Sequence, residues 1–410
     1  MKENNKFNFS PLFLIILISF LIRLVVILFY GDTRVDNEWG ILLNNLYFNK
    51  IYSFYEFENK LIPSSYMPPL YPLVLVLLKI ISFDKINIIN LIFSFQIFLS
   101  LISINIFYKI NKQFFTKKIS LINSIIFSFY ALNIYAVAQI SSITLQIFLS
   151  LLFLQYFFLI TTNNSNKNII IFSLVCGLSL LVRGEFILIL FLTLFYQLIF
   201  RKINFIHLIK ILSISIIIIS PYLIRNYIVF EKVHIVNTKG FNLWKGNNPS
   251  LKVEGSENFH KFKDIKIQIE NIPYNNFYEA KRDKIFLKEA LKNIYEKPNT
   301  YLLHYINKIF SFYFFDINSS YKNYYHFLNI FPTIIISILS LPGFFIFLKS
   351  QDFYKRYFVF YLTFYVFLFS IFFILPRYKL IILPIQIILA TFSIDYLIKK
   401  LIFNIKKYIY

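Results

Sequence analysis

Long apolar runs alternate with short polar segments along the 410 residues of the chain. Several runs approach the ~20 residues that an α-helix needs to cross the hydrocarbon core of a bilayer. They lack the strict alternation of apolar and polar positions that marks a transmembrane β-strand. The pattern predicts an all-α polytopic membrane protein with about ten spans, over residues 11–30, 87–108, 119–138, 141–160, 168–182, 186–200, 203–224, 327–348, 357–375 and 380–398.

A further apolar run, from Leu70 to Phe83, is only fourteen residues long. This length is short for a span and is typical of a helix that lies in the membrane interface. The run over residues 11–30 is too long for the core of a signal peptide, and no small-residue cleavage site follows it. We therefore expect it to remain as the first membrane helix.

Basic residues in short loops predict the orientation of the spans, because such loops are enriched on the cytoplasmic side. These residues are Lys2, Lys6, Lys109, Lys112, Lys117, Lys118, Arg201, Lys202, Lys349, Lys355, Arg356, Lys399, Lys400, Lys406 and Lys407. All of them fall on one side only if the run from Leu70 to Phe83 does not cross. We predict a multi-pass protein of the cytoplasmic membrane, with both termini inside the cell.

Two long segments are then predicted on the outer face. The first outer loop covers residues 31–86 and includes the interface helix at 70–83. The second segment covers residues 226–325 and is expected to be small and mostly helical. In it Phe286, Leu287, Ala290 and Leu291 share one side of a helical pattern, and Pro298 separates two helices.

These boundaries divide the chain into three predicted parts. Residues 1–225 form an N-terminal transmembrane catalytic module, 226–325 the outer segment, and 326–410 the C-terminal transmembrane helices.

Composition excludes some classes of protein. The chain is 58% hydrophobic, which is more than a soluble domain of this length needs to bury. Its net charge of +22 arises from 42 basic against 20 acidic residues. We do not interpret this charge as nucleic-acid binding, because the basic residues lie in short loops between spans. The single cysteine, Cys176, excludes an internal disulfide.

Polar residues gather at the predicted outer face. The stretch "GDTRVDNEWG" after the first span contains the acids Asp32, Asp36 and Glu38. Arg183 lies between two short spans, and Arg225 opens the second outer segment. Arg377, Tyr378 and Lys379 lie at the last outer turn. For any single residue among these, a role as a loop charge is an equally good interpretation.

Taken together, the acids and cations suit sugar transfer from a polyprenyl-phosphate donor. An arginine fork can hold phosphate oxygens and neutralise a departing phosphate. A carboxylate opposite can take the proton from an acceptor hydroxyl or amine as that group attacks the anomeric carbon. No glycine-rich phosphate loop is present among the eight glycines of the chain, which disfavours a nucleotide-sugar donor.

Four stretches resemble the GT-C glycosyltransferases, in order along residues 11 to 398. They are "VDNEWGILLNNLYF" with the later "MPPLYPLVLVLL", "LSLLVRGEFILIL", "SPYLIRNYIVFEKVHIVNTKGFNLWKGNNP" and "PRYKLIILPIQIILA". They are most similar to the group of dolichyl-phosphate-mannose protein mannosyltransferases and bacterial undecaprenyl-phosphate aminoarabinose transferases. The resemblance implies a GT-C-like bundle with interface helices in the first outer loop.

It also implies roles for individual residues. Asp36 matches the catalytic base, Glu38 shapes the site, and Asp32 is the rival base. Arg183, Arg225, Arg377 and Tyr378 are the candidates for binding the donor phosphate. Arg23, within the first span, either joins them or bonds neighbouring helices.

Tyr66 and Pro68 are predicted to contact substrate, together with Trp244 and Lys245. The alternative for Trp244 and the following "KGNNP" is a loop corner that caps the outer segment. The five histidines have no ligand spacing, and no metal or other cofactor is predicted. Asp32, Asp36 and Glu38 could hold a divalent cation but do not require one.

Two other functions remain open. A transporter or flippase of lipid-linked sugars would place ionisable residues near the middle of its spans, whereas here they lie mainly at outer ends. A polysaccharide polymerase or ligase would also bind lipid-linked sugars, but would not be expected to have the acidic first loop followed by "PPLYP". The predicted partners are a polyprenyl-phosphate sugar, a lipid, glycan or protein acceptor, and the bilayer.

Overall fold

The computed structural model describes residues 10–83, 85–255, 258–319 and 326–409. Its first part contains ten α-helices and one hairpin. These are α1 (Pro11–Tyr30), α2 (Glu38–Phe48), β1 (Ser53–Phe57), β2 (Lys60–Pro63), α3 (Leu70–Ser82), α4 (Ile88–Asn111), α5 (Lys117–Phe129), α6 (Ala131–Ala138), α7 (Ile143–Thr162), α8 (Asn166–Val182), α9 (Phe186–Ile199) and α10 (Phe205–Phe230).

The second part begins with the outer segment and ends with three long helices. These elements are α11 (Lys239–Gly246), η1 (Phe259–Lys261), α12 (Lys263–Glu270), α13 (Tyr278–Glu296), α14 (Pro298–Tyr313), α15 (Phe327–Lys349), α16 (Phe353–Ser370), η3 (Pro376–Ile381) and α17 (Leu383–Ile409). The prediction of an all-α membrane protein with a small helical outer segment is therefore confirmed.

Each of the ten apolar runs corresponds to helix in the structure. Among the described residues, five helices are long and apolar enough to cross a bilayer: α1, α4, α7, α10 and α15. The run over 119–138 forms α5 and α6, which are bent by 49° and together make a sixth candidate span. The short run at 70–83 forms α3, with Leu73, Leu77 and Ile81 exposed, as expected for a helix at an interface.

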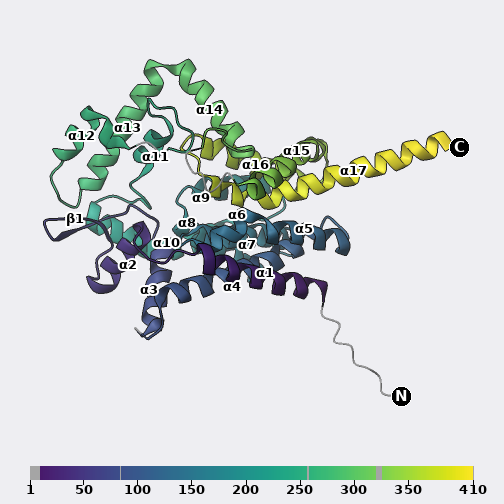
Figure 1. Ribbon diagram of the computed structural model, residues 1–410, viewed down its shortest axis with the longest axis horizontal. Coiled ribbons are helices and arrows are strands. Elements are labelled where there is room, and N and C mark those ends of the chain that lie inside the picture. Colours follow the sequence, from purple (N-terminus) through teal and green to yellow (C-terminus); the bar gives the residue numbers. More distant parts are fainter. Residues whose placement is uncertain (1–9, 84, 256–257, 320–325, 410) are drawn as a thin grey trace.

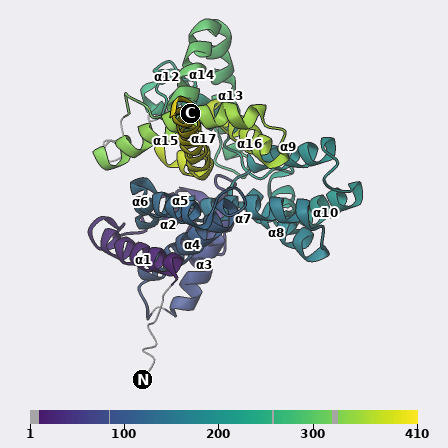
Figure 2. The same cartoon turned by 90° about the vertical axis from the view of Figure 1, so that its right-hand side faces the viewer.

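The helices pack in two groups that lie side by side. In the first group α7 packs against α4 and α8, and α8 packs against α10. In the second, α15 packs along α17 and against α16, and α17 reaches back to α5. Figure 2 shows α15, α16 and α17 above the layer formed by α5, α6 and α7.

The outer segment and the hairpin lie at one end of the molecule. Figure 1 shows α2, β1, α12 and α13 at the left, whereas the start of α1 and the end of α17 point to the right. The start of α1 and the end of α17 therefore lie on the side of the molecule away from the outer segment.

Arg23 bonds neighbouring helices and does not join the other arginines. Its side chain in α1 is fully buried. Its Nε donates to Ser100 Oγ of α4 at 2.9 Å, and Nη1 donates to the Ser128 carbonyl of α5 at 3.2 Å and to Ser19 Oγ. These bonds satisfy Nε and Nη1 of a charge that would otherwise be costly inside a bilayer, whereas Nη2 is buried without a hydrogen-bond partner in the described residues.

The outer segment has its own small core. Trp244 is fully buried there against Phe262 and Phe286, and Ala290 belongs to the same cluster. The predicted helical face needs a correction, because Leu291 is 53% exposed. The side of α13 that packs carries Phe286 and Ala290, and it faces α11.

Candidate active site

A large polar cavity lies between the outer segment and the ends of the membrane helices. Its volume is about 540 Å³. The charged residues that line it come from four separate stretches of the chain, and we call it the charged cavity. They are Asp32, Glu38, Arg183, Lys245 and Arg377.

Asp32 is the acid of the first loop that is fixed at this cavity. Its backbone N–H donates to the Ala138 carbonyl at 3.0 Å, and its Oδ2 accepts from the Ile140 N–H at 2.7 Å. Asn37 Nδ2 donates to the Ile140 carbonyl at 3.0 Å, so the loop is attached at both ends to the link between α6 and α7. Asp36 lies between these attachments with an exposed side chain, outside the residues that line the cavity.

Glu38 enters the cavity as the first residue of α2. Asn37 caps this helix, because its Oδ1 accepts from the Trp39 and Gly40 N–H groups. The Glu38 carboxylate lies outside the membrane spans and influences the pKa values of two other groups that line the cavity. It opposes the lowering of the Lys245 pKa by burial, and it helps burial to raise the pKa of Tyr66 to about 12.

Arg183 and Arg377 both line the charged cavity. Arg183 ends α8, donates from Nε to Gln146 Oε1 at 3.2 Å, and lies over the Tyr378 ring with 4.6 Å to its centroid. Arg377, next to that tyrosine in η3, has no hydrogen bond or ion pair within the described residues. An arginine that is half-buried in a polar cavity without a protein partner is suited to an anionic ligand.

Lys245 reaches the cavity from α11 of the outer segment. Its Nζ lies over the rings of Phe241 (5.2 Å) and Phe373 (4.8 Å). The next residue, Gly246, packs on the backbone of Phe373, where a Cβ atom would come within 2.5 Å of its nitrogen. Only glycine allows this approach, which places the outer segment directly against the turn that presents Arg377.

Besides Asp36, two further predicted site residues lie outside the charged cavity. Arg225 uses its guanidinium within the protein, with Nη1 donating to the Ser64 carbonyl at 2.8 Å and Nη2 to the Tyr52 carbonyl at 3.1 Å. It therefore anchors the first outer loop and does not line the charged cavity. Trp244 is fully buried in the core of the outer segment, so the interpretation as a corner that caps this segment is the one that fits.

The cavity also contains side chains that the sequence did not single out. Tyr66 and Pro68, which were predicted, line it together with Phe54, Phe241 and Phe373. The Phe54 and Tyr66 rings are stacked at 4.3 Å. The alternating stretch "SFYEF" could have indicated the strand that carries Phe54, but nothing local marks the two other phenylalanines.

The outer wall of the charged cavity is held by a buried carboxyl group. Glu279 Oε1 of α13 accepts from the Ser65 N–H at 3.0 Å and from Ser65 Oγ at 2.8 Å. His234 Nε2 lies 2.9 Å from the same hydroxyl. Burial raises the pKa of Glu279 to about 8 despite these hydrogen bonds. These hydrogen bonds to Ser65 hold the next residue, Tyr66, at the wall of the charged cavity.

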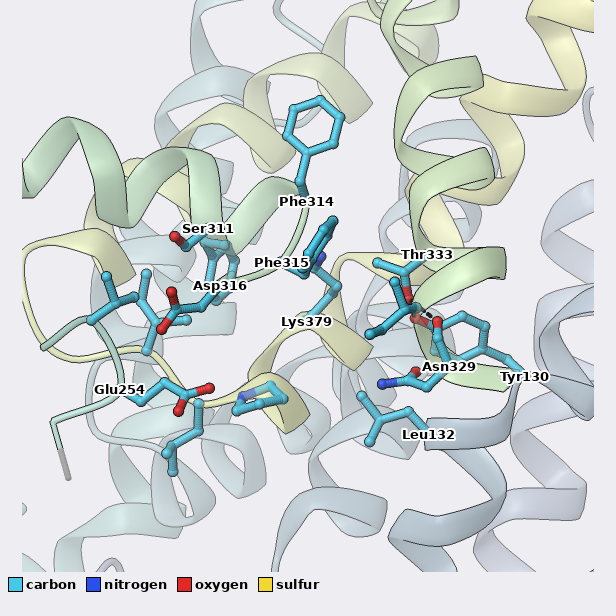
Figure 3. Close-up of a pocket in the computed structure, with 16 residues that line it drawn as sticks. Tyr130, Leu132, Glu254, Ser311, Phe314, Phe315, Asp316, Asn329, Thr333 and Lys379 are labelled. Atoms are coloured by element: carbon cyan, nitrogen blue, oxygen red, sulfur yellow. Dashed lines mark hydrogen bonds between the residues drawn. The ribbon is translucent and has the colours of Figure 1, made fainter. Parts of the chain in front are cut away.

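A second cavity meets the charged cavity at Leu375, which lines both. It measures about 40 Å³, and we call it the Lys379 cavity. Figure 3 shows Glu254, Ser311 and Asp316 on one side of it and Tyr130, Asn329 and Thr333 on the other, with Lys379 between. The Lys379 amine is buried without a hydrogen-bond partner in the described part of the chain, and burial lowers its pKa.

The charged cavity does not provide a complete set of metal ligands. Its acids, Asp32 and Glu38, supply two carboxylates, and no group of three His, Cys, Asp or Glu residues among the described residues is placed to hold a metal. Hard divalent cations take six or more oxygen ligands, several of them from water or substrate. The chemistry proposed below uses side chains alone.

Comparison with known proteins identifies the fold. The chain matches an oligosaccharyltransferase from Archaeoglobus fulgidus, solved in complex with Zn and sulfate, with a TM-score of 0.56 and 12% identity over 96% of this chain and 50% of that one. A structure of the archaeal oligosaccharyltransferase AglB from Archaeoglobus fulgidus, with an inhibitory peptide and a dolichol-phosphate, gives 0.54 and 12% over 95% and 50%. The chain thus spans about half the length of these proteins.

ArnT from Cupriavidus metallidurans, bound to undecaprenyl phosphate, gives a TM-score of 0.42 and 9% identity over 93% of this chain and 77% of that one. No protein-family model matches the sequence, and no curated protein matches it. The chain therefore has the fold of the archaeal oligosaccharyltransferases over nearly its whole length, which agrees with the GT-C-like bundle that the four stretches in the sequence predicted.

Proposed function

We propose that the chain is an integral-membrane glycosyltransferase that moves a sugar from a polyprenyl-phosphate donor to an acceptor at the outer face of the cytoplasmic membrane. The observation that carries the proposal is the charged cavity, which two carboxylates line together with three cations and aromatic rings. One of these cations, Arg377, has no hydrogen bond or ion pair within the described residues. Glu38 of α2 and Lys245 of α11 line the cavity. These two helices lie at the end of the molecule away from the start of α1 and the end of α17, which the basic loops predict to be cytoplasmic.

In the proposed reaction Asp32 is the base. The Ile140 N–H fixes its Oδ2, and the other oxygen is positioned to take a proton from the acceptor hydroxyl or amine. The acceptor atom forms a bond to the anomeric carbon as the bond from that carbon to the phosphate oxygen breaks. The electron pair leaves with the polyprenyl phosphate, whose added negative charge Arg377 and Arg183 neutralise.

The remaining residues position the substrates. Glu38 accepts hydrogen bonds from the acceptor, and Lys245 contacts the donor phosphate or a sugar hydroxyl. The stacked pair of Phe54 and Tyr66 supports a sugar ring, because the negative faces of aromatic rings suit the sugar's C–H groups. Asp36, preferred as the base from the sequence, has no such position, so the geometry favours its rival.

A transfer assay in membranes tests this proposal. Radiolabelled polyprenyl-phosphate sugars are offered with the cell's own lipids and glycans as acceptors. The parent is compared with Asp32→Asn and Asp36→Asn at matched expression. We expect Asp32→Asn to lose at least about 100-fold in transfer, the usual contribution of a general base, and Asp36→Asn to stay within about threefold of the parent.

Two results would contradict the proposal. Loss of transfer in Asp36→Asn alone would restore the earlier choice of base and remove the role given to Asp32. A parent that transfers no sugar but moves lipid-linked sugar across vesicles would be a flippase instead of an enzyme.

A further inference from the structure

A groove on the outer segment has the lining of a saccharide site. Its volume is about 290 Å³, close to the lower end of the ~300–1,000 Å³ typical of ligand pockets. Its walls carry the rings of Tyr55, Phe259, Tyr274 and Tyr278. Tyr274 is 51% exposed, so a flat aromatic face is open to solvent at this place. We call this site the outer groove.

Polar groups surround these rings. His260, Lys266, Glu270 and Arg282 line the same groove. Lys266 and Glu270 are one helical turn apart on α12, with 3.7 Å between Nζ and Oε1, and both side chains are about half exposed. Such an exposed ion pair contributes little to folding, so its donors and acceptors are available to a ligand.

A continuous series of aromatic contacts joins the outer groove to the charged cavity. It starts at Tyr66, which lines the cavity and lies 6.1 Å from Tyr55. Tyr55 meets Tyr278 at 5.3 Å, and Tyr278 meets Phe57 at 5.0 Å. The Phe57 ring then stacks on Tyr274 at 3.7 Å. The hairpin of β1 and β2 supplies the rings on one side of this series, and α13 with the residues before it supplies the other.

Arg282 occupies the junction between the two sites. Its Nη1 donates to the Tyr55 hydroxyl at 2.7 Å. Its guanidinium also lies 4.9 Å from the ring of Phe241, which lines the charged cavity, and 5.4 Å from the ring of Phe259 in the outer groove. Figure 1 shows the hairpin, α12 and α13 at the same end of the molecule.

The exposed ring of Tyr274 and the surrounding hydrogen-bonding groups indicate the class of ligand. Sugar rings present C–H faces that pack on aromatic rings and hydroxyls at the edge that bond to charged and polar side chains. A lipid chain would instead require a long apolar groove without charges along it. The charges of the outer groove thus exclude an acyl or prenyl chain as its occupant.

We propose that the outer groove binds the growing body of a glycan acceptor, whose terminal sugar reacts in the charged cavity. The inference rests on the proposed glycosyl transfer, and it makes an oligosaccharide the acceptor class. Because the outer groove lies apart from the reacting centre, longer acceptors gain contacts with the exposed Tyr274 ring that a single sugar in the charged cavity cannot make. The enzyme therefore prefers long acceptors over short ones.

The test measures binding and transfer separately. Surface oligosaccharides released from the native cell are fluorescently labelled and divided into a monosaccharide fraction and a long-chain fraction. Binding of each fraction is measured, without donor, to the full chain in nanodiscs. The variants are Tyr274→Ala, which removes the exposed ring, Tyr274→Phe, which retains it, and the control Tyr295→Ala, whose side chain on α13 is 88% exposed and outside the groove.

We expect the long-chain fraction to bind about tenfold more weakly to Tyr274→Ala than to the parent, which corresponds to ~1.4 kcal/mol. Tyr274→Phe and Tyr295→Ala should bind like the parent, and the monosaccharide fraction should bind equally to all four proteins. Parental binding by Tyr274→Ala, or no binding of long chains to the parent, would overturn the inference. A groove that serves a protein partner would give the second result.

Asp32→Asn separates this inference from the proposed function. If it binds the long-chain fraction normally but transfers no sugar, both proposals stand. If it transfers sugar normally while Tyr274→Ala still loses long-chain binding, the groove stands and the assigned catalytic role fails.

Discussion

The charged cavity and the Lys379 cavity share a wall at Leu375, yet they differ in what their cations can do. In the charged cavity, of about 540 Å³, the guanidinium of Arg183 lies on the Tyr378 ring, and Arg377 is open to a ligand. The Lys379 cavity, of about 40 Å³, has room for only a few waters beside its buried amine. Both cavities contain a cation, but only the charged cavity is large enough to hold a ligand. The volume of the cavity therefore distinguishes the candidate binding site from the enclosed Lys379 amine.

The η3 turn explains how neighbouring residues reach different cavities. A 3₁₀-helix has ~3 residues per turn, so side chains two positions apart point in directions about 120° apart around the helix axis. Arg377 and Lys379 are separated in this way in η3 (Pro376–Ile381). The order "PRYK" thus sends one cation to the charged cavity and the other to the enclosed one.

The largest expected difference between the two cavities is in activity. Arg377→Ala should lower transfer by about 100-fold, because it removes a charge that neutralises the departing phosphate. Lys379→Met should stay within about threefold of the parent, since the long apolar side chain fills the same space. The check is the transfer assay on both variants at matched expression. Equal losses would mean that the two cavities act as one site.

The hydrogen bonds between Glu279 and Ser65, which support the wall of the charged cavity, should make the free energy of unfolding depend on pH. The pKa of Glu279 is about 8 in the folded protein, because burial raises it above its ordinary value of 4.5, so the folded state keeps a proton that the unfolded chain has released. Stability should therefore fall as pH rises from 4.5 to 8, by about 2 kcal/mol between pH 6 and pH 8, and level off above that.

The measurement for this prediction is the thermal midpoint in detergent across that range. Glu279→Gln is the comparison, because it removes the titrating group and should flatten the profile relative to the parent. A parental midpoint that rises with pH relative to the variant would contradict the assignment.

The planar shape of the Arg183 guanidinium, as well as its charge, should affect the rate of sugar transfer. Arg183→Lys keeps the charge but loses the planar group that lies on Tyr378 and donates to Gln146, so transfer should fall by about tenfold. Arg225→Lys is the matched control. It breaks the bonds to Ser64 and Tyr52, so it should lower the thermal midpoint while the folded enzyme retains its kcat. A parental rate in Arg183→Lys would remove this residue from phosphate binding.

The smallest expected effect is the change in the free energy of unfolding when Lys379 is replaced. Lys379→Met removes a buried amine without a protein partner and should stabilise the fold by about 1 kcal/mol. Arg23→Met, which removes a buried cation with several bonds, should destabilise it. Unfolding of the two variants in detergent measures this contrast. A loss of stability in Lys379→Met would show that its amine has a stabilising partner.

The helices could be predicted from the sequence because apolar length alone determines them. Each of the ten runs is helical, and the short run before residue 83 forms a separate helix. The bend between α5 and α6 was not predicted, since Tyr130 leaves the helical conformation without a proline or glycine to mark it. The hairpin from Ser53 to Pro63 was also missed, although its residues alternate.

The site was harder to predict because its members meet only through tertiary packing. Asp32 and Asp36 are four residues apart and chemically identical, and the bond from the Ile140 N–H, more than a hundred residues away, separates them. Trp244 and Lys245 are adjacent, yet one is in the core and the other lines the cavity. Residue type and spacing indicated the chemistry, whereas the direction of each side chain came from the fold.

The most direct test of the charged cavity as the site of transfer measures donor binding and sugar transfer on the same purified proteins. Asp32→Asn should bind the polyprenyl-phosphate sugar within about threefold of the parent while losing at least about 100-fold in transfer, because the base acts only as the acceptor attacks. Arg377→Ala should lose donor binding as well. Transfer at the parental rate by Asp32→Asn would contradict the account.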